Sequence, residues 1–130
     1  MGLKLKIIDL DGIYFQDEVD LINLTIASGN VTILQHHIPL ISSIDISHMY
    51  VKKNDITTYY AIAGGTLFVT ESECKIITTA VEAKDEIDYI RADKAKQRAL
   101  DRLNDEKSDN IDIKRAEVAL KKAINRLSLR

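Results

Sequence analysis

Apolar and polar residues alternate with period two in the first part of the chain, which predicts β-strands rather than helices. Turn-forming residues, such as those at Asp11 to Gly12 and Ser28 to Asn30, recur roughly every 8–12 positions. Residues 1–84 are therefore expected to form an antiparallel β-sandwich or flattened barrel. The predicted strands are Leu3–Asp9, Val19–Ala27, Ile46–Lys52, Ile56–Ala63, Leu67–Thr70 and Lys75–Thr79.

Two stretches in this part of the chain depart from the alternation. Pro39 has no backbone N–H and disfavours helix at Ile38, so Gln35–Leu40 is expected to be an extended loop or a sheet edge. Gly64 and Gly65 lie between two predicted strands, without the surrounding pattern of a phosphate-binding loop. We interpret the glycine pair as a place where two backbones approach closely or where a strand bulges.

After Glu82 the apolar period becomes 3.6, which predicts an antiparallel two-helix hairpin over residues 85–130. Segments Asp85–Ala92 and Asp109–Ala116 share the motif Asp-x-Ile-Asp-x-x-Arg-Ala, which predicts that Asp85 and Asp109 are the N-caps of two helices. Each helix carries a stripe of mainly small residues, which buries little apolar area, so the hairpin is expected to be marginally stable alone. The stripes are Ala92, Ala95, Ala99 and Leu103, and Ala116, Leu120, Ala123 and Leu127.

Basic residues form a row beside each of these stripes. Packing the stripes together brings the rows close, and like charges at short range need water, acidic partners or a bound anion between them. Arginine suits a phosphate, because its planar guanidinium can donate two parallel hydrogen bonds. The alternative is a solvated face with local ion pairs, such as Asp88 with Arg91 and Asp101 with Arg98. The rows are Arg91, Arg98 and Arg102, and Arg115, Lys122 and Arg126.

Composition excludes several classes of protein. The net charge is -2, and it is unevenly distributed: residues 1–85 contain 6 Lys/Arg and 11 Asp/Glu, whereas residues 86–130 contain 12 Lys/Arg and 9 Asp/Glu. This asymmetry is too mild for a dedicated nucleic-acid-binding protein. No apolar run approaches the roughly 20 residues that span a bilayer, and no signal peptide or anchor is expected. Cys74 is the single cysteine, which excludes an intrachain disulfide. We find no nucleophile constellation, and no metal-ligand spacing around His36, His37 and His48.

Taken together, the motifs resemble the epsilon-subunit family of the F-type proton-translocating ATP synthase along essentially the whole chain. Leu3–Gly12 is similar to the opening strand and turn of that family, Ser28–Leu40 to its Gly-Ile-Leu-Pro-x-His-x-Pro-Leu segment, and Ala61–Leu67 to its Val-x-Gly-Gly-Phe. Ile87–Ala92 matches the Ile/Leu-Asp-x-x-Arg-Ala motif at which bacterial members bind ATP, and Ile111–Ser128 resembles the second helix. The departures from these motifs are Thr32, Gln35 and Thr66, which stand for a glycine, a proline and an aromatic residue.

The resemblance implies a non-catalytic rotor subunit that couples proton translocation to ATP synthesis, with the catalytic sites on other subunits. In that family the sandwich docks on the gamma subunit and the c-ring, and the hairpin either folds beside the sandwich or extends to the alpha and beta subunits and blocks ATP hydrolysis. The implied location is peripheral, on the cytoplasmic face of the cell membrane, with membrane association only through the complex. The expected rotor-interface residues are Ser28, Gly29, Asn30, Val31, His36, His37 and Pro39.

The resemblance also implies that ATP is a regulatory ligand that stabilises the folded hairpin, while the sequence requires no metal. Lys122 stands where closely similar ATP-binding members have arginine; lysine keeps the charge but loses the forked hydrogen bonds, so weaker binding is expected. The alternative function is a freestanding ATP-sensing module without a rotor role. The expected ATP-binding residues are Glu82, Ile87, Asp88, Arg91, Ala92, Arg98, Lys122 and Arg126.

Overall fold

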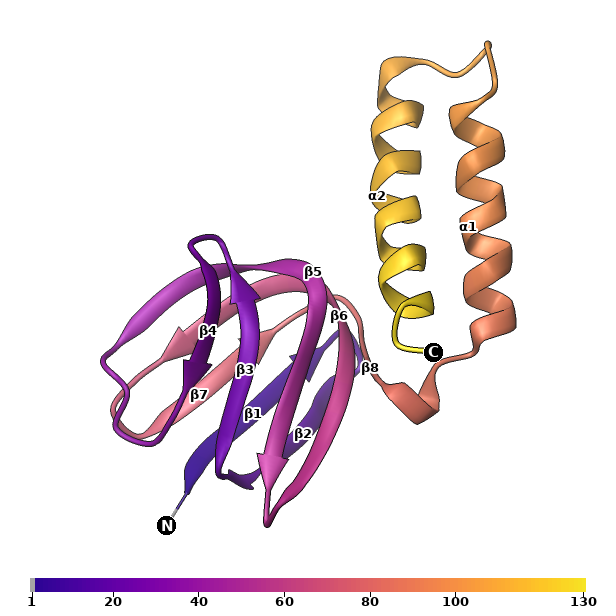
Figure 1. Cartoon of the computed structure of the whole chain (residues 1–130). Helices are drawn as coiled ribbons and strands as arrows, with labels where there is room; N and C mark the ends of the chain where they lie inside the picture. The colour runs from indigo at the N-terminus through magenta and orange to yellow at the C-terminus, as the bar shows by residue number, and fades with distance from the viewer. Residues whose placement is uncertain (1) are drawn as a thin grey trace. The chain divides into compact units, whose positions relative to one another are not determined.

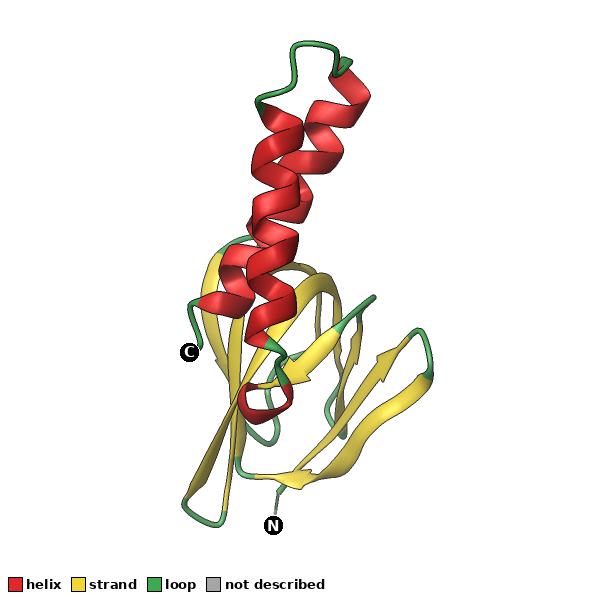
Figure 2. Cartoon of the chain, turned by 90° about the vertical axis from the view of Figure 1, so that its right-hand side faces the viewer, coloured by secondary structure: helices red, strands yellow, loops and turns green. Residues whose placement is uncertain are grey.

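Two compact units, Met1–Lys84 and Asp85–Arg130, make up the chain, and the computed structural model describes residues 2–130. The first unit is built of strands and the second of two helices that run side by side in opposite directions (Figures 1 and 2). The structure thus confirms the predicted fold class, a β-sandwich followed by a helical hairpin.

One sheet, curled over on itself, forms the sandwich (Figure 1). Its strand order is β2-β1-β7-β6-β5-β3-β4, and β8 pairs with β6 beside this path. The strands are β1 (Leu3–Asp9), β2 (Gly12–Val19), β3 (Leu21–Ile26), β4 (Gly29–Ile33), β5 (Leu40–Lys53), β6 (Ile56–Val69), β7 (Glu73–Ile77) and β8 (Val81–Ala83).

Alternating aliphatic side chains of these strands fill the space inside the curled sheet. In β3, for example, Ile22, Leu24 and Ile26 are buried while the residues between them are half-buried. Because side chains alternate between the two faces of a strand, a shift of one residue would turn this whole set toward solvent. Every member of the hydrophobic core cluster lies between Leu3 and Ala83, so the sandwich contains its own complete core.

Three strands escaped the sequence prediction, each for a physical reason. β2 lies at an edge of the sheet and pairs only with β1 among the described residues, so most of its side chains are exposed and carry no apolar alternation. β4 and β8 have five and three residues, too few to show a period. The expectation of an antiparallel sheet was also wrong at one pair, because β1 and β7 run parallel, with Leu5 opposite Cys74.

The glycine pair does not separate two strands, as predicted, but lies inside the continuous strand β6. The partner of β6 changes here, from β8 at Tyr60–Ile62 to β7 at Thr66–Val69. A Cβ atom on Gly65 would lie 2.2 Å from the carbonyl oxygen of Ile77, and both glycines have positive φ. The expectation of close backbone approach is therefore confirmed.

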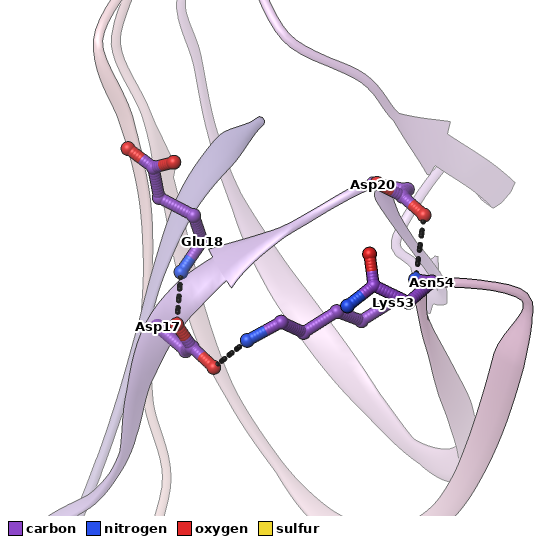
Figure 3. Close-up of polar contacts among 5 residues, drawn as sticks. All are labelled: Asp17, Glu18, Asp20, Lys53 and Asn54. Carbon is purple, nitrogen blue, oxygen red and sulfur yellow. Dashed lines mark hydrogen bonds and ion pairs between the residues drawn. The ribbon is translucent and has the colours of Figure 1, made fainter. Parts of the chain in front are cut away.

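The turn at Lys53 to Asp55 joins β5 and β6, and polar contacts connect it to the end of β2 (Figure 3). Asn54 and Asp55 both have positive φ, and Asp20 accepts a hydrogen bond of 3.0 Å from the Asn54 N–H. Lys53 forms an ion pair with Asp17. The hydrogen bond from Lys53 is the main reason why the pKa of Asp17 is lowered.

Cys74 is fully buried on β7, and burial raises the pKa of its thiol from 9.0 to about 12. The folded state therefore favours the neutral thiol, whereas the unfolded chain ionises near pH 9. We expect this contribution to stability to be complete below pH 9 and to be lost as the pH rises toward 12.

This pH dependence can be measured by urea unfolding of the wild type and of Cys74→Ala between pH 8 and pH 11. The alanine variant should be less stable at pH 8 because of the cavity, but the difference should shrink as the pH rises. A difference that stays constant over this range would show that the thiol is not held neutral by burial.

The helical unit consists of α1 (Tyr89–Leu103) and α2 (Asn110–Leu127), preceded by a 3-10 turn at Lys84–Glu86. Asp109 is the N-cap of α2 as predicted, since its side chain accepts a hydrogen bond of 2.8 Å from the Asp112 N–H. The predicted N-cap Asp85 is wrong, because it lies in the 3-10 turn and α1 begins one turn later. Asp88 caps α1 instead and accepts a hydrogen bond of 3.0 Å from the Arg91 N–H.

Candidate functional site

Buried alanines mark the face on which α1 and α2 pack against each other. Ala92 and Ala99 on α1, and Ala116 and Ala123 on α2, are at most 4% exposed. Residues seven apart return to the same face of a helix within about 20°, so each pair forms one stripe, as the sequence predicted. Such small side chains allow the two helix axes to approach closely.

The basic rows lie beside these stripes on the same edge of the hairpin. On each helix every residue of the basic row comes directly before a residue of the stripe in sequence, for example Arg98 before Ala99 and Lys122 before Ala123. The row is therefore rotated by about 100° from the stripe around the helix axis. The helices run in opposite directions, and a rotation of the same sign on two antiparallel helices points to the same side of the pair (Figure 1). Both rows therefore lie on the same side of the helix pair.

The residues of the two rows also occupy related levels along the hairpin. The guanidinium carbon of Arg130 lies 5.7 Å from the ring centroid of Tyr89, which places the end of α2 beside the start of α1. Arg91 and Arg126 lie close to these two ends. Going from them toward the connection between the helices, Lys122 is about one turn away on α2, and Arg98 about two turns away on α1.

Solvent can reach this basic edge. Arg91 and Arg98 are exposed, while Lys122 and Arg126 are half-buried. The side chains of Arg91 and Arg98 form no ion pair with any residue between 2 and 130. The local ion pairs of the alternative interpretation do not form here: Asp88 accepts a hydrogen bond from the backbone N–H of Arg91, and Asp101 accepts one from the side chain of Gln97. These guanidinium groups remain available to an anion.

The other residues predicted to bind ATP contribute to packing, to the cap of α1 or to the sheet. Ala92 is fully buried and its N–H donates to the carbonyl oxygen of Asp88, so it contributes packing to α1. Ile87 is 6% exposed. Asp88 uses one carboxylate oxygen for the helix cap and is otherwise exposed. Glu82 belongs to the sandwich unit, where it lies on β8 opposite Ala61.

The predicted rotor-interface residues lie in two segments of the sandwich, one at the turn before β4 and the start of β4, the other in the loop between β4 and β5. Ser28, Gly29 and Asn30 are exposed at the tight connection of β3 and β4, and the side chain of Asn30 exchanges hydrogen bonds with that of Asn23 across this hairpin. His36, with positive φ, lies in the loop between β4 and β5. Val31 and His37 are half-buried, whereas Pro39 is exposed.

Exposed aliphatic side chains accompany this second loop, and the sequence prediction missed them. Leu34, Ile38 and Ile41 have exposed fractions of 52%, 76% and 72%. Leu34 and Ile38 lie in the loop that contains Pro39, whereas Ile41 lies near the start of β5 and faces outward because side chains alternate along the strand. A cluster of exposed apolar side chains is typical of a surface that binds another protein.

The part of the chain that the structure describes contains no group of three or more His, Cys, Asp or Glu residues that could hold a metal. Neither α1 nor α2 is long and apolar enough to cross a membrane.

Comparison with protein families matches both units. Residues 2–84 match the beta-sandwich domain of the ATP synthase delta/epsilon chain, and residues 85–129 match its long alpha-helix domain. The chain belongs to the ATP synthase epsilon-chain family. The resemblance inferred from the sequence motifs is thus confirmed.

Curated relatives agree with this assignment. The chain is 38% identical to the ATP synthase epsilon chain of Bacillus cytotoxicus over 103 residues, which cover 79% of this chain and 77% of that protein. It is 39% identical to the ATP synthase epsilon chain of Priestia megaterium over 105 residues, which cover 81% of this chain and 78% of that protein.

Solved structures with the epsilon-chain fold are far more distant in sequence. A chain in the mitochondrial ATP synthase of Euglena gracilis has a TM-score of 0.81 and 20% identity, with 95% of this chain and 78% of that chain covered. A chain in the central stalk and c-ring structure of the Tetrahymena thermophila mitochondrial ATP synthase has a TM-score of 0.67 and 9% identity, with 98% and 96% covered. At these identities the likeness concerns the fold.

Proposed function

We propose that this epsilon-family chain is a non-catalytic subunit of the central stalk of an F-type ATP synthase, which couples proton translocation to ATP synthesis. The observation that carries the proposal is the match of both units to the family, in order and over nearly the whole chain. One structural neighbour belongs to an assembly of central stalk and c-ring, which supports the same role. Catalysis is then the task of other subunits, and the complex holds the chain at the cytoplasmic face of the membrane.

In this proposal the sandwich binds the gamma subunit and the c-ring. The exposed aliphatic side chains of Leu34, Ile38 and Ile41 support a docking role for the loop between β4 and β5, together with the neighbouring His36 and Pro39. Co-expression with the gamma subunit of the same organism tests it. The two proteins should co-purify, and Ile38→Asp should weaken the complex. A chain that is folded but never retained by gamma would favour the alternative, a freestanding ATP-sensing module.

The hairpin is proposed to inhibit ATP hydrolysis when it extends toward the alpha and beta subunits. The helices pack on alanines, which bury far less apolar area than the aliphatic core of the sandwich. A unit held by so little burial can be opened by a few kcal/mol of partner contact. The cationic side chains of α2 provide charges that acidic surfaces of the catalytic subunits can bind.

ATP is the proposed regulatory ligand, and it stabilises the hairpin by binding its phosphates between the two basic rows. Arg91 and Arg98 on α1, and Lys122 and Arg126 on α2, lie on the same side of the helix pair, so an anion bound there would relieve the repulsion between them. The exposed Arg91 and Arg98 side chains support this, since they have no carboxylate partner among residues 2–130. Asp88 is proposed to lie nearer the base and ribose, next to Ile87 and Ala92.

We expect calorimetry to detect ATP binding to the isolated chain, and Arg91→Ala or Arg126→Ala to weaken it by roughly 10- to 100-fold, the loss of a hydrogen bond to a charged group. Lys122→Arg should tighten binding, because arginine can donate two hydrogen bonds to one phosphate. The matched control is Lys121→Arg, since Lys121 points about 100° away from Lys122 on the same helix.

Absence of any heat signal at millimolar ATP would remove the ligand from the proposal. Binding that survives Arg91→Ala and Arg126→Ala would show that the nucleotide lies elsewhere. Either result would leave the rotor role standing, because that role depends on the sandwich.

A further inference from the structure

β8 (Val81–Ala83) is the last strand of the sandwich and leads directly into the helical unit. It has three residues, and its register on β6 places Ala83 opposite Tyr60 and Glu82 opposite Ala61. The Ala63 N–H donates to the Ala80 carbonyl oxygen at 3.0 Å, so positions 63 and 80 form a hydrogen-bonded pair. Because bonded and non-bonded pairs alternate in an antiparallel ladder, the N–H of Ala83 points away from β6.

Tyr14 of β2 supplies the partner for this outward N–H. Its hydroxyl oxygen accepts a hydrogen bond of 3.2 Å from the Ala83 N–H. The Tyr14 ring meets the ring of Tyr60 edge to face, with centroids 6.3 Å apart and an interplanar angle of 81°. Tyr14 thus contacts both members of the final register pair, Tyr60 and Ala83, from a strand 69 positions away in sequence.

β8 is also held less firmly than its neighbour β7. β7 has five residues and pairs with β1 on one side and β6 on the other. β8 has three residues, pairs with β6 in the ladder, and meets β2 through the side chain of Tyr14. A short strand with few backbone hydrogen bonds is expected to open locally before the rest of a sheet.

We propose that β8 is a detachable strap and that Tyr14 is its latch, a positioning residue which determines how firmly the segment leading into the helices is fixed to the sandwich. Opening of the strap would lengthen the free connection to the helical unit without unfolding the sandwich core. This regulatory device goes beyond the proposed function, and its test needs neither nucleotide nor a partner subunit.

The test compares backbone amide hydrogen exchange in the wild type and in Tyr14→Phe, which keeps the ring contact with Tyr60 and removes only the hydroxyl. We expect the Ala83 amide to exchange at least about tenfold faster in Tyr14→Phe, because a nearly buried N–H loses its acceptor. The amides of Cys74 and Ile76 on β7 should keep their wild-type rates. The control is Tyr59→Phe. The ring of Tyr59 packs on the ring of Tyr50 on the neighbouring strand, with centroids 5.8 Å apart, so this substitution leaves the contact between Tyr14 and Ala83 unchanged.

Three results would overturn the proposal. An unchanged Ala83 exchange rate in Tyr14→Phe would show that the hydroxyl does not hold the strap. Equal acceleration at Ala83, Cys74 and Ile76 would show that Tyr14 stabilises the whole sandwich and that β8 does not open separately. Acceleration at Ala83 in Tyr59→Phe as well would also contradict a latch specific to Tyr14.

Discussion

Gly65→Ala is expected to remove a large part of the stability of the sandwich. The new Cβ atom would lie 2.2 Å from the Ile77 carbonyl oxygen and 3.1 Å from both the Ile77 carbonyl carbon and the Thr78 Cα. These are backbone atoms, so no side-chain rotation can relieve the clash. Together with a φ of +144°, the cost is on the order of 4 kcal/mol, against about 5–15 kcal/mol for a whole domain.

Gly12→Ala is the matched control for this substitution. Gly12 has a φ of +115°, but a Cβ atom there would have no heavy atom within 4 Å, so the variant measures the backbone strain without the clash. Urea unfolding followed by circular dichroism should give a loss of about 1–2 kcal/mol for Gly12→Ala and a loss clearly larger for Gly65→Ala. Equal losses would show that the strands do not approach closely at position 65.

The reason for this sensitivity is that β6 exchanges partners at the glycine pair. The hydroxyl of Thr78, which is buried, donates to the Gly64 carbonyl oxygen at 2.5 Å, and the Thr78 N–H donates to the Ile8 carbonyl oxygen at 2.9 Å. Thr78 therefore links β6 to β1 at the place where β7 ends and before β8 begins. Any displacement of Ile77 and Thr78 by a new methyl group would disturb three strands at once.

Local pattern was enough to predict the fold class and the division near residue 85, because alternation and helical period are properties of short segments. Local pattern could not predict the pairing of strands far apart in sequence, such as β1 with β7, because the residues of one strand do not specify which strand lies beside it. Gly64 and Gly65 illustrate the limit: the sequence indicated close approach, but only the structure identifies Ile77 as the neighbour.

The candidate ATP site could also be predicted only in part from the sequence. Period and spacing alone placed Arg91 and Arg98 on one face of α1, and the structure keeps them there. The N-cap was misassigned because Asp85 and Asp88 both satisfy the local rule, and tertiary context selects the second. Ala92, which matched a ligand motif in sequence, is fully buried, so part of that motif reflects helix packing.

Removal of residues 86–130 is expected to raise the ATPase activity of the assembled complex at low ATP. If the hairpin occupies its inhibitory position half of the time, its loss should give about a twofold increase, and more if the occupancy is higher. The shortened chain should still fold and still bind gamma, because the whole core cluster lies between Leu3 and Ala83. Its thermal midpoint and its co-purification with gamma provide the controls for assembly.

Charge reversal on α2 separates inhibition by the hairpin from a general effect of truncation. Lys114 and Lys121 are exposed, so Lys114→Glu combined with Lys121→Glu should preserve the alanine packing while weakening attraction to acidic catalytic surfaces. We expect this double variant to raise hydrolysis nearly as much as the deletion. Its difference from the wild type should shrink at high ionic strength, where the attraction is already screened. Hydrolysis that stays at the wild-type rate after the deletion, with gamma still bound, would exclude an inhibitory role for the hairpin.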